Sequence, residues 1–120
     1  MPALDRRKCL SSHVTWVVVA DDSRATIYAV PRGMARLREV FELRRAGQAG
    51  GFGAELAQHL EEARAEGRYD ELVLVAAPAF LGVLRDQLSG VARGALVGEI
   101  GKDLVGARRE ILQEEVLRVL

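Results

Sequence analysis

Four acidic residues are the candidates for metal chemistry in this sequence: Asp21, Asp22, Glu99 and Asp103. Each lies near the end of a run expected to form a strand, where a sheet could bring their carboxylates together. Such carboxylates can hold two Mg²⁺ ions that stabilise the attacking and leaving oxygens during phosphodiester cleavage. The alternative is structural: Asp21 and Asp22 accept hydrogen bonds in a tight turn, and Lys102 pairs with an acid. We favour this alternative because the apolar run 72–76 supplies no acid.

Arginine is concentrated in the first half of the chain, although the whole sequence has a net charge of zero. Residues 1–53 contain nine Lys and Arg against five Asp and Glu, a balance of +4, whereas residues 54–120 contain eight against twelve, a balance of −4. This asymmetry could present a basic face to RNA or to an acidic partner. The simpler interpretation, which we favour, is an arginine-rich strand surface and glutamate-rich helix surfaces.

The hydrophobic pattern predicts an α/β domain of five strands and three helices. Strands are predicted at residues 15–20, 24–30, 35–43, 71–76 and 95–100, and helices at 54–66, 78–88 and 108–120, with a helix as the alternative at 35–43. Short turns join the first three strands, so these should form an antiparallel meander. Residues 72–76, Leu-Val-Leu-Val-Ala, should be covered on both faces. The order β-β-β-α-β-α-β-α therefore predicts a mixed five-stranded sheet with helices packed on its faces, as in ribonuclease H-like folds.

Length and composition indicate one globular domain. With 120 residues and 49% hydrophobic content the chain can bury a core. We expect residues 1–12 to be a disordered or loosely attached tail and residues 13–120 to form the domain. No apolar run approaches the ~18 residues of a membrane-spanning helix, and Cys9 alone cannot form an internal disulfide. A cytoplasmic protein without membrane insertion and without a cofactor is expected. An open sheet edge and the apolar residues 116–120 predict a homodimer.

Several sequence blocks in a consistent order carry a family resemblance. They are residues 16–25 (Trp-Val-Val-Val-Ala-Asp-Asp-Ser-Arg-Ala), 55–60 (Glu-Leu-Ala-Gln-His-Leu), 67–70 (Gly-Arg-Tyr-Asp), 72–78 (Leu-Val-Leu-Val-Ala-Ala-Pro), 80–82 (Phe-Leu-Gly) and 97–104 (Val-Gly-Glu-Ile-Gly-Lys-Asp-Leu). Over residues 14–112 the chain resembles the bacterial host attachment family, the "protein required for attachment to host cells". That family is related to the middle domain of archaeal and eukaryotic class-1 peptide release factors, which implies a ribonuclease H-like fold.

The resemblance draws attention to one short loop. Family members usually carry a long polar insertion before the first helix, and here this segment is reduced to residues 44–53. In release factors a Gly-Gly-Gln loop at this position promotes hydrolysis of the peptidyl-tRNA ester. This chain has Gly47 and Gln48, but Ala46 occupies the place of the first glycine. If that position requires a positive φ, alanine costs about 1 kcal/mol or more, so a simple Gly/Ala connector is the favoured interpretation.

Three functional hypotheses follow from the residues and the resemblance. The leading one is a non-enzymatic binding module that associates with the ribosome or RNA. Its contact residues would be arginines: Arg24, Arg36, Arg38, Arg44 and Arg45. The first alternative is a peptidyl-tRNA ester hydrolase that uses Gly47 and Gln48. The second is a metal-dependent nuclease that uses the four acids named above.

Overall fold

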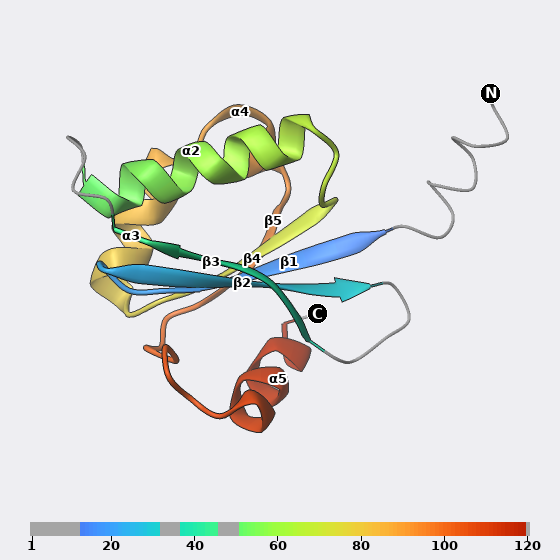
Figure 1. The fold of residues 1–120 in the computed structure, drawn as a ribbon, viewed down its shortest axis with the longest axis vertical. Helices are drawn as coiled ribbons and strands as arrows, with labels where there is room; N and C mark the ends of the chain where they lie inside the picture. The colour runs from blue at the N-terminus through green and yellow to red at the C-terminus, as the bar shows by residue number, and fades with distance from the viewer. Residues whose placement is uncertain (1–12, 32–36, 46–50, 120) are drawn as a thin grey trace, which may run out of the picture.

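The fold is a mixed five-stranded sheet with helices on both faces (Figure 1). The computed structural model describes residues 13–31, 37–45 and 51–119. Its strands are β1 (Val14–Ala20), β2 (Arg24–Pro31), β3 (Arg38–Arg44), β4 (Glu71–Val75) and β5 (Leu96–Ile100). Its helices are α2 (Gly51–Ala65), α3 (Pro78–Gln87), α4 (Gly90–Gly94) and α5 (Arg109–Leu117). The predicted α/β class and mixed five-stranded sheet are confirmed, and the described part of 35–43 is a strand.

The strand order in the sheet is β3-β2-β1-β4-β5. The first three strands form the predicted antiparallel meander, and β4 adds parallel to β1, followed by β5 parallel to β4. The β1–β2 turn is held by one side chain, because Oδ1 of Asp21 accepts hydrogen bonds from the backbone N–H groups of Ser23 (2.8 Å) and Arg24 (2.9 Å). This is the turn role that the sequence predicts for Asp21.

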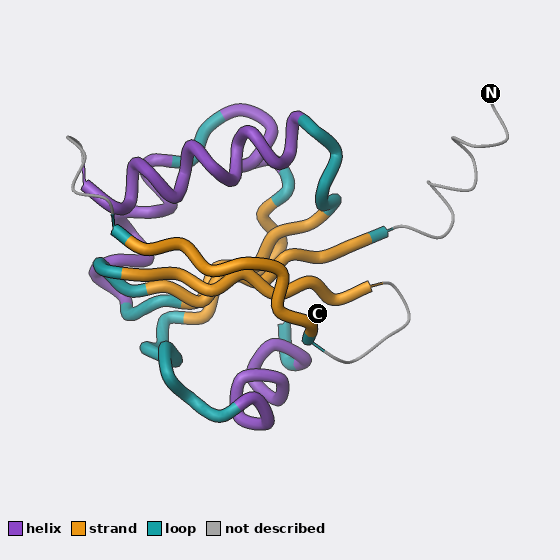
Figure 2. Tube along the Cα trace, in the orientation of Figure 1, coloured by secondary structure: helices purple, strands orange, loops and turns teal. Residues whose placement is uncertain are grey.

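Two hydrophobic cores lie on opposite faces of the sheet. Figure 2 shows α2, α3 and α4 on one side and α5 on the other. The larger core packs Trp16, Val18, Leu72 and Leu74 against α2 and α3, and the smaller packs strand residues such as Val73 against α5. Leu72, Val73, Leu74 and Val75 are each 0% exposed. Burial of both faces explains why β4 has an uninterrupted apolar sequence.

Both edge strands contain a register shift. In β3 the pairing passes from Ile27 with Phe41 to Tyr28 with Glu39, which leaves Val40 without a cross-strand partner. In β5 it passes from Leu72 with Leu96 to Val73 with Gly98, which leaves Val97 unmatched. Bulges of this kind disfavour pairing with another edge strand. The homodimer stays a prediction, although a bulge interrupts the regular pairing of both edge strands, β3 and β5.

Helix α4 was not predicted from the sequence, and a side chain from another helix caps it. One carboxylate oxygen of Glu61 in α2, Oε2, accepts a hydrogen bond from the backbone N–H of Ser89 at 2.6 Å. The other, Oε1, accepts one from the N–H of Ala92 at 3.3 Å. The first N–H groups of a helix have no partner within the helix, so Glu61 supplies partners for α4. None of the described helices has the length and hydrophobicity needed to span a bilayer.

A close contact between α2 and α3 gives a prediction about stability. A Cβ atom at Gly53 would lie 2.9 Å from Cγ1 of Val83. Gly53→Ala should therefore lower the free energy of unfolding by about 1 kcal/mol, because crowding outweighs the gain in helix propensity. In a Val83→Ala background the same substitution should raise it by up to about 1 kcal/mol. Urea denaturation of the four proteins measures this coupling, and equal effects in both backgrounds would contradict the contact.

Candidate functional site

The carboxyl ends of the parallel strands β1, β4 and β5 meet at one edge of the sheet. The chain leaves β1 toward β2 on one side, and it leaves β4 through α3 toward β5 on the other. In open α/β sheets, ligands bind in the crevice outside the carboxyl ends of the strands where the connections diverge in this way. Figure 1 shows the β1–β2 turn and the starts of α2 and α3 at this end of the molecule.

A shallow, open depression of about 360 Å³ lies at this divergence point. We call it the crevice, and it is lined by Asp21, Asp22, Ala77, Ala79, Phe80 and Val83. Phe80 stacks on Phe52 at the start of α2, with ring centroids 6.3 Å apart and an interplanar angle of 17°. The lining therefore combines an apolar wall from α3 with two carboxylates from the β1–β2 turn.

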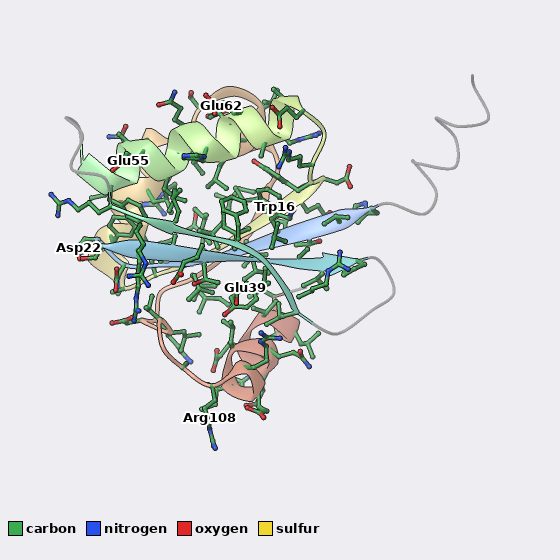
Figure 3. The ribbon with its side chains drawn as sticks, viewed as in Figure 1. Trp16, Asp22, Glu39, Glu55, Glu62 and Arg108 are labelled. Atoms are coloured by element: carbon green, nitrogen blue, oxygen red, sulfur yellow. The ribbon has the colours of Figure 1, made fainter. Side chains whose placement is uncertain are left out.

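The two aspartates of the crevice differ in the hydrogen bonds that they accept. Asp21 is tied into the turn by the hydrogen bonds given above. Asp22 is exposed at the tip of the hairpin (Figure 3), and its Oδ1 accepts a hydrogen bond of 3.3 Å from the hydroxyl of Ser23. Neither forms an ion pair with any Lys, Arg or His that the structure describes. Two carboxylates without a described ion pair thus lie beside an apolar wall, and the backbones of Arg24 and Arg45 are hydrogen-bonded to the same turn.

The other two acids proposed for metal binding have separate partners. Glu99 forms an ion pair with Arg85 at 3.1 Å, and Oδ1 of Asp103 accepts a hydrogen bond from the backbone N–H of Val105 at 3.3 Å. The predicted ion pair of Lys102 exists and is made with Glu115 at 3.0 Å. Within residues 13–31, 37–45 and 51–119, no three His, Cys, Asp or Glu side chains are grouped so that they could hold a metal ion. The structure therefore does not assemble Asp21, Asp22, Glu99 and Asp103 into a metal site.

The proposed arginine contacts fall into two places. Arg24 and Arg44 lie directly opposite each other across β2 and β3. Arg45 follows at once, and its backbone N–H donates to the carbonyl oxygen of Ser23 at 2.8 Å. We call these three residues the arginine corner. Arg38, by contrast, lies opposite Ala29 toward the other end of the strand pair, and Arg36 lies outside the described residues.

A second cavity, of about 210 Å³, adjoins the arginine corner on the α5 side of the sheet. Arg24, Thr26, Tyr28 and Glu42 line it together with Val19 and residues 104–107. The guanidinium of Arg109 lies 5.3 Å from the ring centre of Tyr28. Burial raises the pKa of Tyr28, with Arg109 opposing and the carboxylates of Glu39 and Glu42 adding to the rise. At neutral pH this phenol is therefore a neutral hydroxyl that can donate a hydrogen bond.

Only the two ends of the loop that could hydrolyse an ester lie within the described residues. Gly47 and Gln48 lie outside the described residues. The two described ends of the loop, Arg45 and Gly51, both lie at the carboxyl edge of the sheet, and Gly51 has a φ of +82° that favours glycine. The segment therefore leaves from the arginine corner and enters α2 beside the crevice.

Comparison with known protein families identifies the family of this chain. The family model of the protein required for attachment to host cells matches residues 44–116, which include α2, β4, α3, β5 and most of α5. The chain belongs to this family. The predicted host attachment family is thereby confirmed, and the match begins at the arginine corner and contains the α3 wall of the crevice. A comparison with curated proteins gives no match.

Solved structures share the fold of this host attachment family member. Pelota from Archaeoglobus fulgidus is similar with a TM-score of 0.58 at 20% identity, over 97% of this chain and 36% of Pelota. An archaeal protein is similar with a TM-score of 0.56 at 13% identity, over 88% of this chain and 36% of its own. The chain thus spans about a third of each neighbour, and identities this low show the fold alone.

Sequence reasoning missed the apolar part of the crevice. Phe80 is only half-buried, and Val83, which the sequence pattern gave no role, is 49% exposed. Two features of the sequence indicate the crevice when they are considered together. Aspartates follow one strand, and the small residues Ala77 and Ala79 follow the next parallel strand and line the crevice.

Proposed function

We propose that this chain is a non-enzymatic binding domain that associates with RNA, most simply that of the ribosome, through the arginine corner. The observation that carries the proposal is the direct apposition of Arg24 and Arg44 across two neighbouring strands. Like charges in directly opposed positions destabilise a strand pair. A position that costs the fold stability is a candidate for binding, and guanidinium groups suit the phosphate backbone of RNA.

The surroundings of the corner support a role in contact with a large anion. The side chain of Arg44 is 70% exposed, and its ion pair with Glu42 is long, at 3.6 Å. Arg24 forms no ion pair with any described residue and lines the cavity that also contains Thr26 and Tyr28. Hydroxyl and guanidinium groups are common donors to phosphate oxygens. Ribosomal RNA is the source that the resemblance to release factors implies.

Removal of the two opposed arginines is the direct test. We expect the Arg24→Ala/Arg44→Ala protein to bind single-stranded RNA and purified ribosomes about tenfold more weakly at low salt. Between about 50 and 200 mM salt, the slope of log K against log salt should become shallower by about 1.4, or about 0.7 for each lost phosphate contact. The free energy of unfolding should be unchanged or raised by up to about 0.5 kcal/mol, since the repulsion is removed.

A matched control separates a specific surface from overall charge. Arg68→Ala/Arg93→Ala removes the same two charges from exposed positions after α2 and in α4, on the side of the sheet away from α5 and the arginine-corner cavity (Figure 2). This control should bind RNA within about twofold of the unmodified chain. Equal weakening of both double variants, or no binding to ribosomes at low salt, would refute the proposal. Peptidyl-tRNA hydrolysis that Gln48→Ala abolishes would favour the hydrolase instead.

A further inference from the structure

We propose that the crevice binds a small organic ammonium ion, meaning a protonated amine on a short apolar stem. This site is separate from the arginine corner and does not depend on RNA association. It lies on the α3 side of the same sheet edge, and its lining residues belong to the β1–β2 turn and to the segment 77–83.

Size and position indicate a small ligand. The open depression has a volume of about 360 Å³, which gives room for a small molecule because small-molecule sites have volumes of about 300–1,000 Å³. The crevice also occupies the divergence point between β1 and β4, where open α/β sheets place their ligands. Most of its lining is apolar, with a few polar groups at one side, which is the usual composition of such sites.

Charge indicates that the ligand is a cation. Asp21 and Asp22 supply two carboxylates, and the described residues that line the crevice include no Lys or Arg. Neither carboxylate is neutralised by a described cation, as shown above. One oxygen of Asp21 is engaged by the turn and one oxygen of Asp22 by the hydroxyl of Ser23, which leaves the second oxygen of each side chain to accept from a ligand. These free carboxylate oxygens accept hydrogen bonds and would favour an ammonium group over an anion within the crevice.

The apolar wall of the crevice indicates that the ligand also has an apolar stem. Phe80 is held in place by its stack on Phe52, so it presents a fixed ring for a methylene stem or for the cation itself. Val83 is 49% exposed beside it, so a bound stem would remove apolar surface from water. A carboxylate pair at one side and an aromatic and aliphatic wall at the other match an alkylammonium ion.

The experiment is an NMR titration of the ¹⁵N-labelled full chain with hexylammonium, 1-hexanol and hexanoate, which share one stem and differ in charge. We expect hexylammonium to shift the amide signals of residues 21–23 and 77–83 with an affinity in the millimolar range, and hexanol and hexanoate to bind at least about fivefold more weakly. Equal binding of hexanol would overturn the proposal, as would shifts spread over all acidic surfaces. Nα-acetyl-lysine methylamide should bind more weakly than hexylammonium, and tighter binding would assign the crevice to a partner's lysine side chain instead.

Two variants and a control test the residues. Asp22→Asn should weaken hexylammonium binding about fivefold, whereas Asp86→Asn, an exposed acid on α3 outside the crevice lining, should leave it unchanged. Asp21 is not substituted in this test, because the loss of its carboxylate would remove hydrogen bonds that hold the β1–β2 turn. Val83→Lys places an ammonium group at the crevice and should abolish the shifts while the chain keeps its dispersed spectrum. Equal effects of Asp22→Asn and Asp86→Asn, or undiminished binding by Val83→Lys, would contradict the site.

Discussion

Replacement of Leu74 by alanine is expected to lower the free energy of unfolding by about 3 kcal/mol. Leu74 is 0% exposed and lies in β4, between β1 and β5, within the larger core. Truncation of a buried leucine removes its transfer free energy and leaves a cavity, and the observed cost is about 2–5 kcal/mol. Neighbouring strands hold β4 on both sides, so the structure has little freedom to close the cavity. Equilibrium denaturation in urea measures the loss, and an unchanged m value would show that two-state unfolding is retained.

Leu117 provides the matched control for Leu74. It is a leucine near the end of α5 with a 46% exposed side chain, so Leu117→Ala should change the free energy of unfolding by less than about 0.5 kcal/mol. If the two substitutions had similar effects, β4 would not be the packed centre of the sheet. That result would also undermine the crevice and the arginine corner, because both are positioned by the strands that pair around β4.

The elements that sequence could predict are those whose pattern is set by burial alone. Residues 72–76 contain no polar side chain because both faces of β4 are covered, and that requirement is visible in five consecutive letters. Helix α2 repeats apolar residues at the helical period, and Leu56, Ala57, Leu60 and Ala63 of this repeat are all buried. In each case the local hydrophobic pattern reflects packing within or against the sheet.

Features that depend on distant residues could not be predicted in this way. Helix α4 has five residues, and its first N–H groups are satisfied by Glu61, which lies 28 positions before Ser89 in the sequence. The sequence around α4 carries no sign of this partner. The unpaired Val40 and Val97 are a second example, because a bulge is a property of two strands in register and alternation in one strand does not reveal it.

The bulge at Val40 also explains why Arg38 does not share a surface with Arg24 and Arg44. Uninterrupted alternation would place Arg38 and Arg44, six residues apart, on the same face of β3. The register shift reverses the face between them. Arg44 therefore lies opposite Arg24, whereas Arg38 lies opposite Ala29, whose side chain belongs to the larger core. Composition could predict an arginine-rich strand pair, but only the register divides it into a corner and a separate residue.

Tyr69 connects α2 to the sheet and makes stability sensitive to alkaline pH. Its side chain is 0% exposed, stacks on Trp16 with ring centroids 4.9 Å apart, and donates a hydrogen bond of 2.8 Å to the carbonyl oxygen of Leu60. Burial, together with the negative charge of Glu61, raises the pKa of Tyr69 to about 12, although Arg64 opposes the rise. A phenol in the unfolded chain has a pKa of about 10.

Between pH 10 and 12 the unfolded chain loses the Tyr69 proton while the folded chain keeps it. The unfolded state then binds fewer protons, so the free energy of unfolding falls as pH rises through this interval. A difference of about 2 pKa units corresponds to about 3 kcal/mol, present in full below pH 10 and lost above about pH 12. Tyr69→Phe lacks the titrating group, so it should be about 1 kcal/mol less stable at pH 8 through the lost hydrogen bond. The free energies of unfolding of the two proteins should be equal at about pH 11, and above this pH Tyr69→Phe should be the more stable protein. Urea denaturation of both proteins at successive pH values measures the crossing, and parallel curves from pH 8 to 12 would show that Tyr69 is not held as a buried neutral phenol.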